Sequence, residues 1–174
     1  MCEVYEVVVT EPVAYFARFV RAKYALSLDS VKTYVSDAAR VDKKVKEMLD
    51  DAVRKMGGHY GDAGPSAYYK AYVYTFCRLR KLKSALIIID WMDEEPYRNH
   101  VNIVAFDLPE PREVASEIKD YERTIEHAME RARGADRELL ERCHYLDVGT
   151  DVKRCLAKAR EVLEEAKADA RPRA

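Results

Sequence analysis

Two apolar stretches, ALIIIDWM at residues 85–92 and VNIVAF at residues 101–106, decide the fold. Both are rich in the β-branched and aromatic residues that favour strands, and the polar sequence DEEPYRNH (93–100) that joins them is typical of a turn. We therefore predict an antiparallel hairpin with a long turn. A further strand is predicted at residues 2–9 (CEVYEVVV), where apolar and polar side chains alternate loosely.

Most of the remaining chain has a helical pattern, with apolar residues at steps of three and four. One long helix is predicted at residues 29–56, where the apolar seam is unbroken until Gly57 and Gly58 end it. The predicted fold class is α+β and mainly α-helical, with a helical N-terminal half, a small antiparallel hairpin-based sheet and C-terminal helices. The other helices are predicted at residues 12–24, 65–83, 109–133, 135–146 and 151–168.

The 174 residues suffice for one compact domain or two small ones. The longest apolar stretch, at residues 85–89, is far below the roughly 20 residues that cross a bilayer. No apolar signal region follows Met1, so we expect a protein that is not secreted and has no membrane span.

The cysteines are Cys2, Cys77, Cys143 and Cys155. They form no CxxC pair and have no histidine at metal-ligand spacing. We expect mostly reduced, packed thiols, and we predict no disulfide framework, no metal and no cofactor.

Charge is distributed unevenly along the sequence although the chain carries a net charge of only −1. The formal charge is −3 for residues 1–11, +8 for 12–84, −8 for 85–130 and +2 for 131–174. This asymmetry predicts a basic helical DNA-binding half with an N-terminal strand (1–84), followed by a hairpin plus helical assembly half (85–174).

The basic half holds enough Lys and Arg to follow a phosphate backbone, and tyrosines among them can bind phosphates or stack on bases. The alternative is that these cations form an ordinary solvated helix face. The predicted nucleic-acid-binding residues are Arg18, Arg21, Lys23, Lys32, Arg40, Lys43, Lys44, Lys46, Arg54, Lys55, Arg78, Arg80, Lys81 and Lys83.

Residues 15–41 resemble the helical core-binding domain of tyrosine recombinases. In that domain a first helix leads through a Leu-Ser turn, here Leu26 and Ser27, into a helix with a Val-x-x-Tyr step, here Val31 and Tyr34. Residues 67–82 are similar to its closing helix. The resemblance implies a helical DNA clamp, and the absence of the recombinase Arg, Lys, His, Arg and Tyr set implies that it cleaves no strand.

The second half resembles the core of PD-(D/E)xK nucleases of the RecB type, in which a strand ending in an acid, here Asp90, precedes a second strand and a helix bearing Tyr121. The second strand runs into Phe106 and Asp107 without the expected lysine, and Glu117 stands where the family has a glutamine. The resemblance therefore implies an inactive relative at most.

No catalytic residue is predicted, and we expect the protein not to be an enzyme. His59, His100, His127 and His144 are scattered along the chain, so surface or loop positions are expected for them. The carboxylates at residues 93–95 are expected to be hydrated rather than to bind a cation.

The composition favours a very hot habitat, because the chain has no Gln and only two Asn (Asn99 and Asn102) beside many Glu, Lys and Arg. Together with basic N-terminal helices at 12–56, this resembles the coat proteins of filamentous and rod-shaped double-stranded DNA viruses of hyperthermophilic archaea. The resemblance implies a non-enzymatic structural protein that coats double-stranded DNA as a homo-oligomer or with a paralogous subunit. It also implies a location in a virion or in the cytoplasm of an archaeal host.

Two alternatives remain. One is a DNA-binding regulator or accessory subunit of a mobile element or defence system. The other is a helical interaction adaptor or a catalytically dead nuclease relative.

Overall fold

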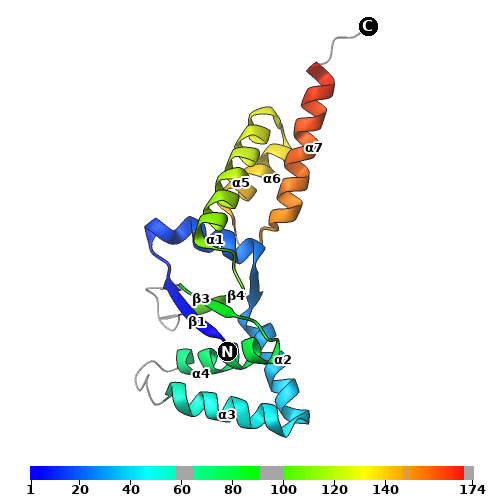
Figure 1. Ribbon diagram of the computed structural model, residues 1–174. Coiled ribbons are helices and arrows are strands. Elements are labelled where there is room, and N and C mark those ends of the chain that lie inside the picture. Colours follow the sequence, from blue (N-terminus) through cyan, green and yellow to red (C-terminus); the bar gives the residue numbers. More distant parts are fainter. Residues whose placement is uncertain (58–64, 91–99, 148, 171–174) are drawn as a thin grey trace. The chain divides into compact units, whose positions relative to one another are not determined.

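The computed structural model describes residues 1–57, 65–90, 100–147 and 149–170 (Figure 1). The chain forms two compact units, which we call unit 1 (Met1–Val13 and Tyr24–Leu108) and unit 2 (Ala14–Lys23 and Pro109–Ala174). Within the described ranges there are seven α-helices and one four-stranded sheet, which confirms the predicted α+β, mainly helical class.

The sheet belongs to unit 1 and has the strand order β1-β3-β4-β2. The predicted hairpin is confirmed, since β3 and β4 pair antiparallel with Ile87 opposite Val104. β1 pairs in parallel with β3, so the sheet is mixed rather than purely antiparallel as predicted. The short edge strand β2 was not predicted, because three residues are too few to show a period. The strands are β1 (Glu3–Val8), β2 (Ala25–Ser27), β3 (Ser84–Asp90) and β4 (His100–Phe106).

The sheet explains why the boundary between the two units does not fall between residues 84 and 85, where it was predicted. That position is the start of β3, and β3 pairs with β1 from the chain's N-terminus. All four strands therefore share one unit, whereas helix α1 (Ala14–Lys23), which lies between β1 and β2 in the sequence, belongs to unit 2.

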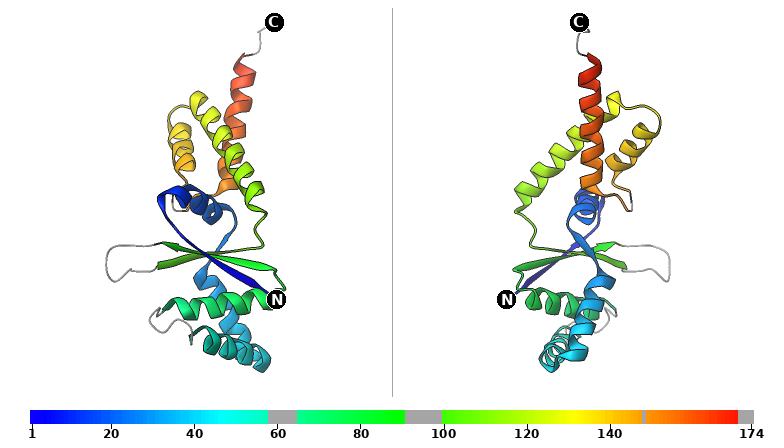
Figure 2. Two further views of the ribbon diagram at one scale, coloured as in Figure 1. Left: turned by 60° about the vertical axis from the view of Figure 1, so that its left-hand side comes forward. Right: turned by 90° about the vertical axis from the view of Figure 1, so that its right-hand side faces the viewer.

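Three helices accompany the sheet in unit 1: α2 (Leu28–Val41), α3 (Lys43–Gly57) and α4 (Pro65–Leu79). Figures 1 and 2 show α4 against one face of the sheet and α3 on the far side of α4. This sandwiched position explains why α4 is apolar nearly all round. The core of unit 1 is formed by side chains from α2, α3, α4 and the sheet, among them Val31, Val35, Val73, Ile87 and Val104.

The single helix predicted at residues 29–56 is wrong, because Asp42 separates α2 from α3. Asp42 has an extended backbone (φ −127°, ψ 112°), and its Oδ1 accepts a hydrogen bond from the Lys44 N–H at 2.9 Å. Aspartate competes with the helical backbone in this way and favours helix caps over helix interiors. Val41, the last residue of α2, is 86% exposed at this corner.

Unit 2 is a helical unit formed by α1, α5 (Pro111–Arg131), α6 (Ala135–Tyr145) and α7 (Val152–Ala170). Its centre is Tyr121, whose ring meets Phe19 of α1 edge to face with centroids 5.5 Å apart. The Tyr121 hydroxyl donates a 2.6 Å hydrogen bond to the carbonyl of Cys143 on α6.

Two disulfides, Cys2–Cys77 in unit 1 and Cys143–Cys155 in unit 2, correct the expectation of reduced thiols. The sequence separations of 75 and 12 match no short cysteine motif. The pairing arises instead from tertiary structure, which places the start of β1 beside α4, and α6 beside the first turns of α7.

None of the described helices is long and apolar enough to cross a membrane.

Candidate nucleic-acid interface

The fourteen cations predicted to bind nucleic acid are divided between the two units. Three of them, Arg18, Arg21 and Lys23, lie on α1 in unit 2, and the other eleven lie in unit 1. Each group has its own partners.

The three cations of α1 interact with unit 2 itself. Arg21 donates a 3.3 Å hydrogen bond to the carbonyl of Leu146, which caps the end of α6, and Lys23 pairs with Glu117 at 2.8 Å. Arg18 lies 5.5 Å from the Tyr15 ring centroid, and its Nε is buried without a hydrogen-bond partner among the described residues. These contacts hold α1 to its neighbours, so the prediction that the three bind nucleic acid finds no support in their positions.

Three cations of unit 1 pair with acids on their own helices. Arg40 lies 3.8 Å from Asp37, while Arg54 and Lys55 lie 3.7 and 3.1 Å from Asp51. All of these side chains are at least half exposed. Exposed pairs of this kind contribute about 0.2–1 kcal/mol, so they do not prevent the cations from meeting another anion.

Three further cations of unit 1 lie over tyrosine rings, each 5.7 Å from the ring centroid. The pairs are Lys32 with Tyr72, Arg78 with Tyr74, and Arg80 with Tyr34. The Tyr74–Arg78 pair has the i,i+4 spacing of helix neighbours, which is a signal that the sequence does contain. The other two pairs join α2 to α4 and its C-terminal turn, and only the fold reveals them.

Most of the unit 1 cations that lack a carboxylate partner among the described residues gather at one end of unit 1. α3 and α4 lie side by side and run in opposite directions, so the start of α3 and the end of α4 are neighbours (Figures 1 and 2). Lys43, Lys44, Lys46, Lys81 and Lys83 are exposed and form no ion pair with any described residue. We call this region the basic end. Its cations are Arg40, Lys43, Lys44, Lys46, Arg78, Arg80, Lys81 and Lys83.

The basic end is a local feature. Residues 37–47 and 78–83 together hold eight Lys and Arg against three Asp and Glu. Unit 1 as a whole has 13 Lys and Arg against 15 Asp and Glu, and unit 2 has 17 against 16. The charge asymmetry along the sequence therefore does not distinguish the two units. Unit 1 contains the basic residues 24–84 together with the acidic residues 1–11 and 85–108.

The helix dipole acts differently on the cations at the end of α4 and on those at the start of α3. Arg78 lies in the last turn of α4, where a cation stabilises the helix, and Arg80 and Lys81 directly follow. Lys43, Lys44 and Lys46 instead lie in the first turn of α3, which contains no acid and carries the positive end of the helix dipole. Helix stability does not explain cations at this position, and they strengthen the attraction of the helix end for anions.

The nuclease-like residues are divided between the two units. Glu117 is paired with Lys23, and Tyr121 is buried in unit 2, whereas β4 belongs to unit 1. The Asp90 and His100 side chains, together with His59 and residues 93–95, lie outside what the structure describes.

One group of side chains that sequence reasoning missed has the donors to hold a metal ion. It consists of Glu122, Glu126 and His144 in unit 2.

Comparison with protein-family models, curated proteins and solved structures finds no match. The resemblances to recombinase, nuclease and viral coat proteins therefore stay predictions.

Proposed function

We propose that this protein is a non-enzymatic double-stranded DNA-binding structural protein, which coats DNA by self-assembly as the coat proteins of archaeal viruses do. The observation that carries the proposal is the first turn of α3, where Lys43, Lys44 and Lys46 are exposed and form no ion pair with any residue that the structure describes. A cation at a helix N-terminus lowers helix stability, so its presence favours a role in binding an anion.

The chemistry of the basic end suits a phosphate backbone. Lysine is a flexible point charge that suits phosphate oxygens, and contacts to phosphate carry no information about base sequence. Tyr34 beside it is 42% exposed and can donate a hydrogen bond to a phosphate. We therefore expect binding that depends on salt and not on sequence, as coating requires.

Two disulfides are compatible with this assignment. Disulfides are rare in most cytosolic proteins, but intracellular proteins of hyperthermophiles are an exception. The composition without Gln favours such a source.

Charge reversal of the α3 lysines tests the interface. We expect the triple variant Lys43→Glu/Lys44→Glu/Lys46→Glu to bind duplex DNA at least about tenfold more weakly, because each lost phosphate contact lowers the log–log salt slope by about 0.9. Fluorescence anisotropy with a labelled random-sequence duplex, repeated over a series of NaCl concentrations, measures both the affinity and the slope.

The matched control is Lys119→Glu/Lys153→Glu/Arg160→Glu, which makes the same charge change on exposed residues of unit 2. This control is expected to retain the wild-type salt slope. Equal losses in both variants would mean that net charge alone governs binding, and unchanged binding of the α3 variant would contradict the proposed interface. Circular dichroism of both variants verifies that they are folded.

Stoichiometry distinguishes a coat protein from a regulator. We expect binding to linear duplex DNA to saturate at a fixed number of base pairs per subunit, to protect the DNA from nuclease, and to give regular filaments in electron micrographs. Binding confined to one short sequence would favour a DNA-binding regulator or accessory subunit. Absence of any DNA binding would favour a helical interaction adaptor.

A further inference from the structure

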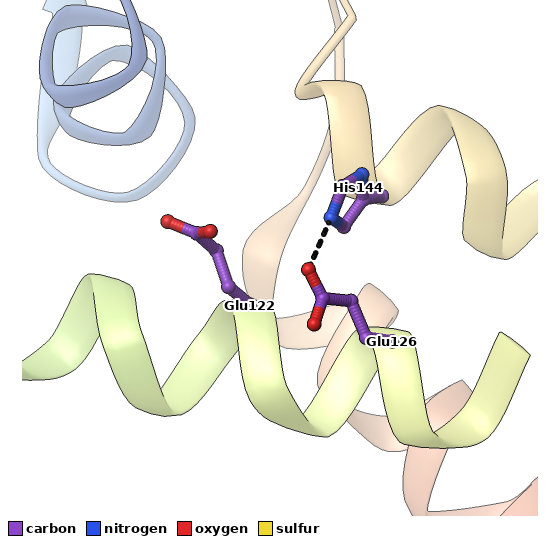
Figure 3. Close-up of side chains that lie close together, drawn as sticks. All are labelled: Glu122, Glu126 and His144. Carbon is purple, nitrogen blue, oxygen red and sulfur yellow. Dashed lines mark hydrogen bonds and ion pairs between the residues drawn. The ribbon is translucent and has the colours of Figure 1, made fainter.

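Three metal-ligating side chains meet in unit 2, on two helices (Figure 3). Glu122 and Glu126 are one helical turn apart on α5, so they lie on the same face, and His144 reaches them from α6. The His144 Nε2 lies 3.0 Å from the Glu126 Oε1. One donor atom from each of the three residues lies within 4.8 Å of the other two.

We propose that Glu122, Glu126 and His144 bind a divalent transition-metal ion of the zinc class, with the remaining coordination positions open to water. The donor set determines the class of ion, because an imidazole nitrogen favours zinc and its neighbours over magnesium or calcium, which take oxygen ligands. Three protein ligands with an open position are typical of zinc sites that bind a water or substrate.

The spacing of the donors fits one ion. Ligand atoms about 2.0–2.2 Å from a tetrahedral zinc lie about 3.4 Å from one another. The His144–Glu126 distance of 3.0 Å already falls near this value, and the 4.8 Å limit means that the Glu122 carboxylate must move closer by at most about 1.4 Å. In Figure 3 the Glu122 carboxylate points away from the His144–Glu126 pair, so this long side chain must rotate toward the pair to bind the same ion.

The backbone beneath the three ligands is held rigidly. Next to Glu122, the Tyr121 hydroxyl donates to the carbonyl of Cys143, which itself precedes His144. Cys143 is bonded to Cys155 of α7, and the Tyr15 hydroxyl donates to the carbonyl of His144 at 2.8 Å. The two helices therefore present their ligands at a fixed spacing, which lowers the entropy cost of binding an ion.

The cluster carries negative charge that unit 2 does not fully neutralise. Within the described part of the chain, Glu122 forms no ion pair and Glu126 pairs only with His144. A bound cation would relieve the repulsion between the carboxylates.

A second His–Glu pair on α5 shows what an ordinary surface pair looks like here. His127 lies 3.8 Å from Glu130 on the same helix, and both are more than half exposed. No carboxylate from another helix joins this pair among the residues the structure describes. It therefore provides a matched control within the same helix.

Metal titration of the full-length, oxidised protein tests the proposal. We expect one Zn²⁺ per chain by isothermal titration calorimetry, and visible d–d absorption when Co²⁺ is used instead. The variants Glu122→Gln, Glu126→Gln and His144→Gln should each weaken Zn²⁺ binding by about 100-fold or more, since even residues that only orient a ligand contribute 10–100-fold. The control variants His127→Gln and Glu130→Gln should bind as the wild type does.

Thermal unfolding gives an independent readout. Zn²⁺ should raise the unfolding temperature of the wild type and of both control variants, because it binds only the folded state. It should leave the three ligand variants unchanged. Absence of both a calorimetric signal and a Co²⁺ spectrum would overturn the proposal, as would equal losses in the ligand and control variants. Because the proposed DNA interface lies in unit 1, the metal result is separate from that of DNA binding.

Discussion

Replacing both Cys2 and Cys77 with alanine is expected to lower the free energy of unfolding of unit 1 by about 4 kcal/mol. The disulfide joins residues 75 apart in sequence, and a loop of that length constrains the unfolded chain strongly. Both cysteines are buried, so the variant also loses some packing in the core of unit 1. Urea denaturation followed by circular dichroism measures the change.

The second disulfide supplies the control for this experiment. Cys143→Ala/Cys155→Ala opens a loop of only 12 residues. We therefore expect it to lower the free energy of unfolding by about 3 kcal/mol, and the affected part is unit 2 instead of unit 1. Reducing agent should have no further effect on a variant lacking all four cysteines. If the Cys2 and Cys77 variant unfolds at the same urea concentration as the wild type, the disulfide does not stabilise the fold.

Replacing Phe19 with alanine is expected to lower the free energy of unfolding of unit 2 by about 3–5 kcal/mol. Phe19 is 1% exposed and packs edge to face on Tyr121, so its loss leaves a cavity beside the centre of unit 2. Native-state hydrogen exchange with mass spectrometry reports where protection is lost. We expect the loss in α5, α6 and α7.

A matched control is Tyr145→Ala, since Tyr145 is an aromatic residue of the same unit but is 63% exposed. Its effect should stay within about 0.5 kcal/mol. If Phe19→Ala instead removed protection mainly from β1, β3 and β4, the assignment of α1 to unit 2 would be falsified.

The regular elements were predictable because their patterns are local. The hairpin follows from two β-rich stretches around a polar turn, and the long helix α5 from its apolar stripe at Val114, Tyr121, Ile125 and Ala128. Features that depend on one side chain or on distant partners were not predictable. The apolar steps continue in phase across Asp42, so they conceal the break between α2 and α3.

The candidate sites show the same limit. The sequence identifies which residues are cationic. It does not show that Lys23 meets Glu117, 94 residues away, whereas Lys43 meets no carboxylate in the part of the chain that the structure describes. The metal-ligating group was missed because two glutamates one turn apart look like any solvated helix face. The third residue of the group, His144, is on a different helix, and its spacing from the two glutamates in the sequence matches no metal-binding motif.

Because α1 belongs to unit 2, cleaving the chain at one position cannot separate the two units. The chain passes from one unit to the other at residues 13–14, 23–24 and 108–109, so neither unit is a contiguous segment. During synthesis on a ribosome, α1 emerges long before the helices that cover it. Until α5 is complete, Phe19 and Val20 lack their burial partners, and a truncated product ending at Leu108 would carry them as an exposed, adhesive surface.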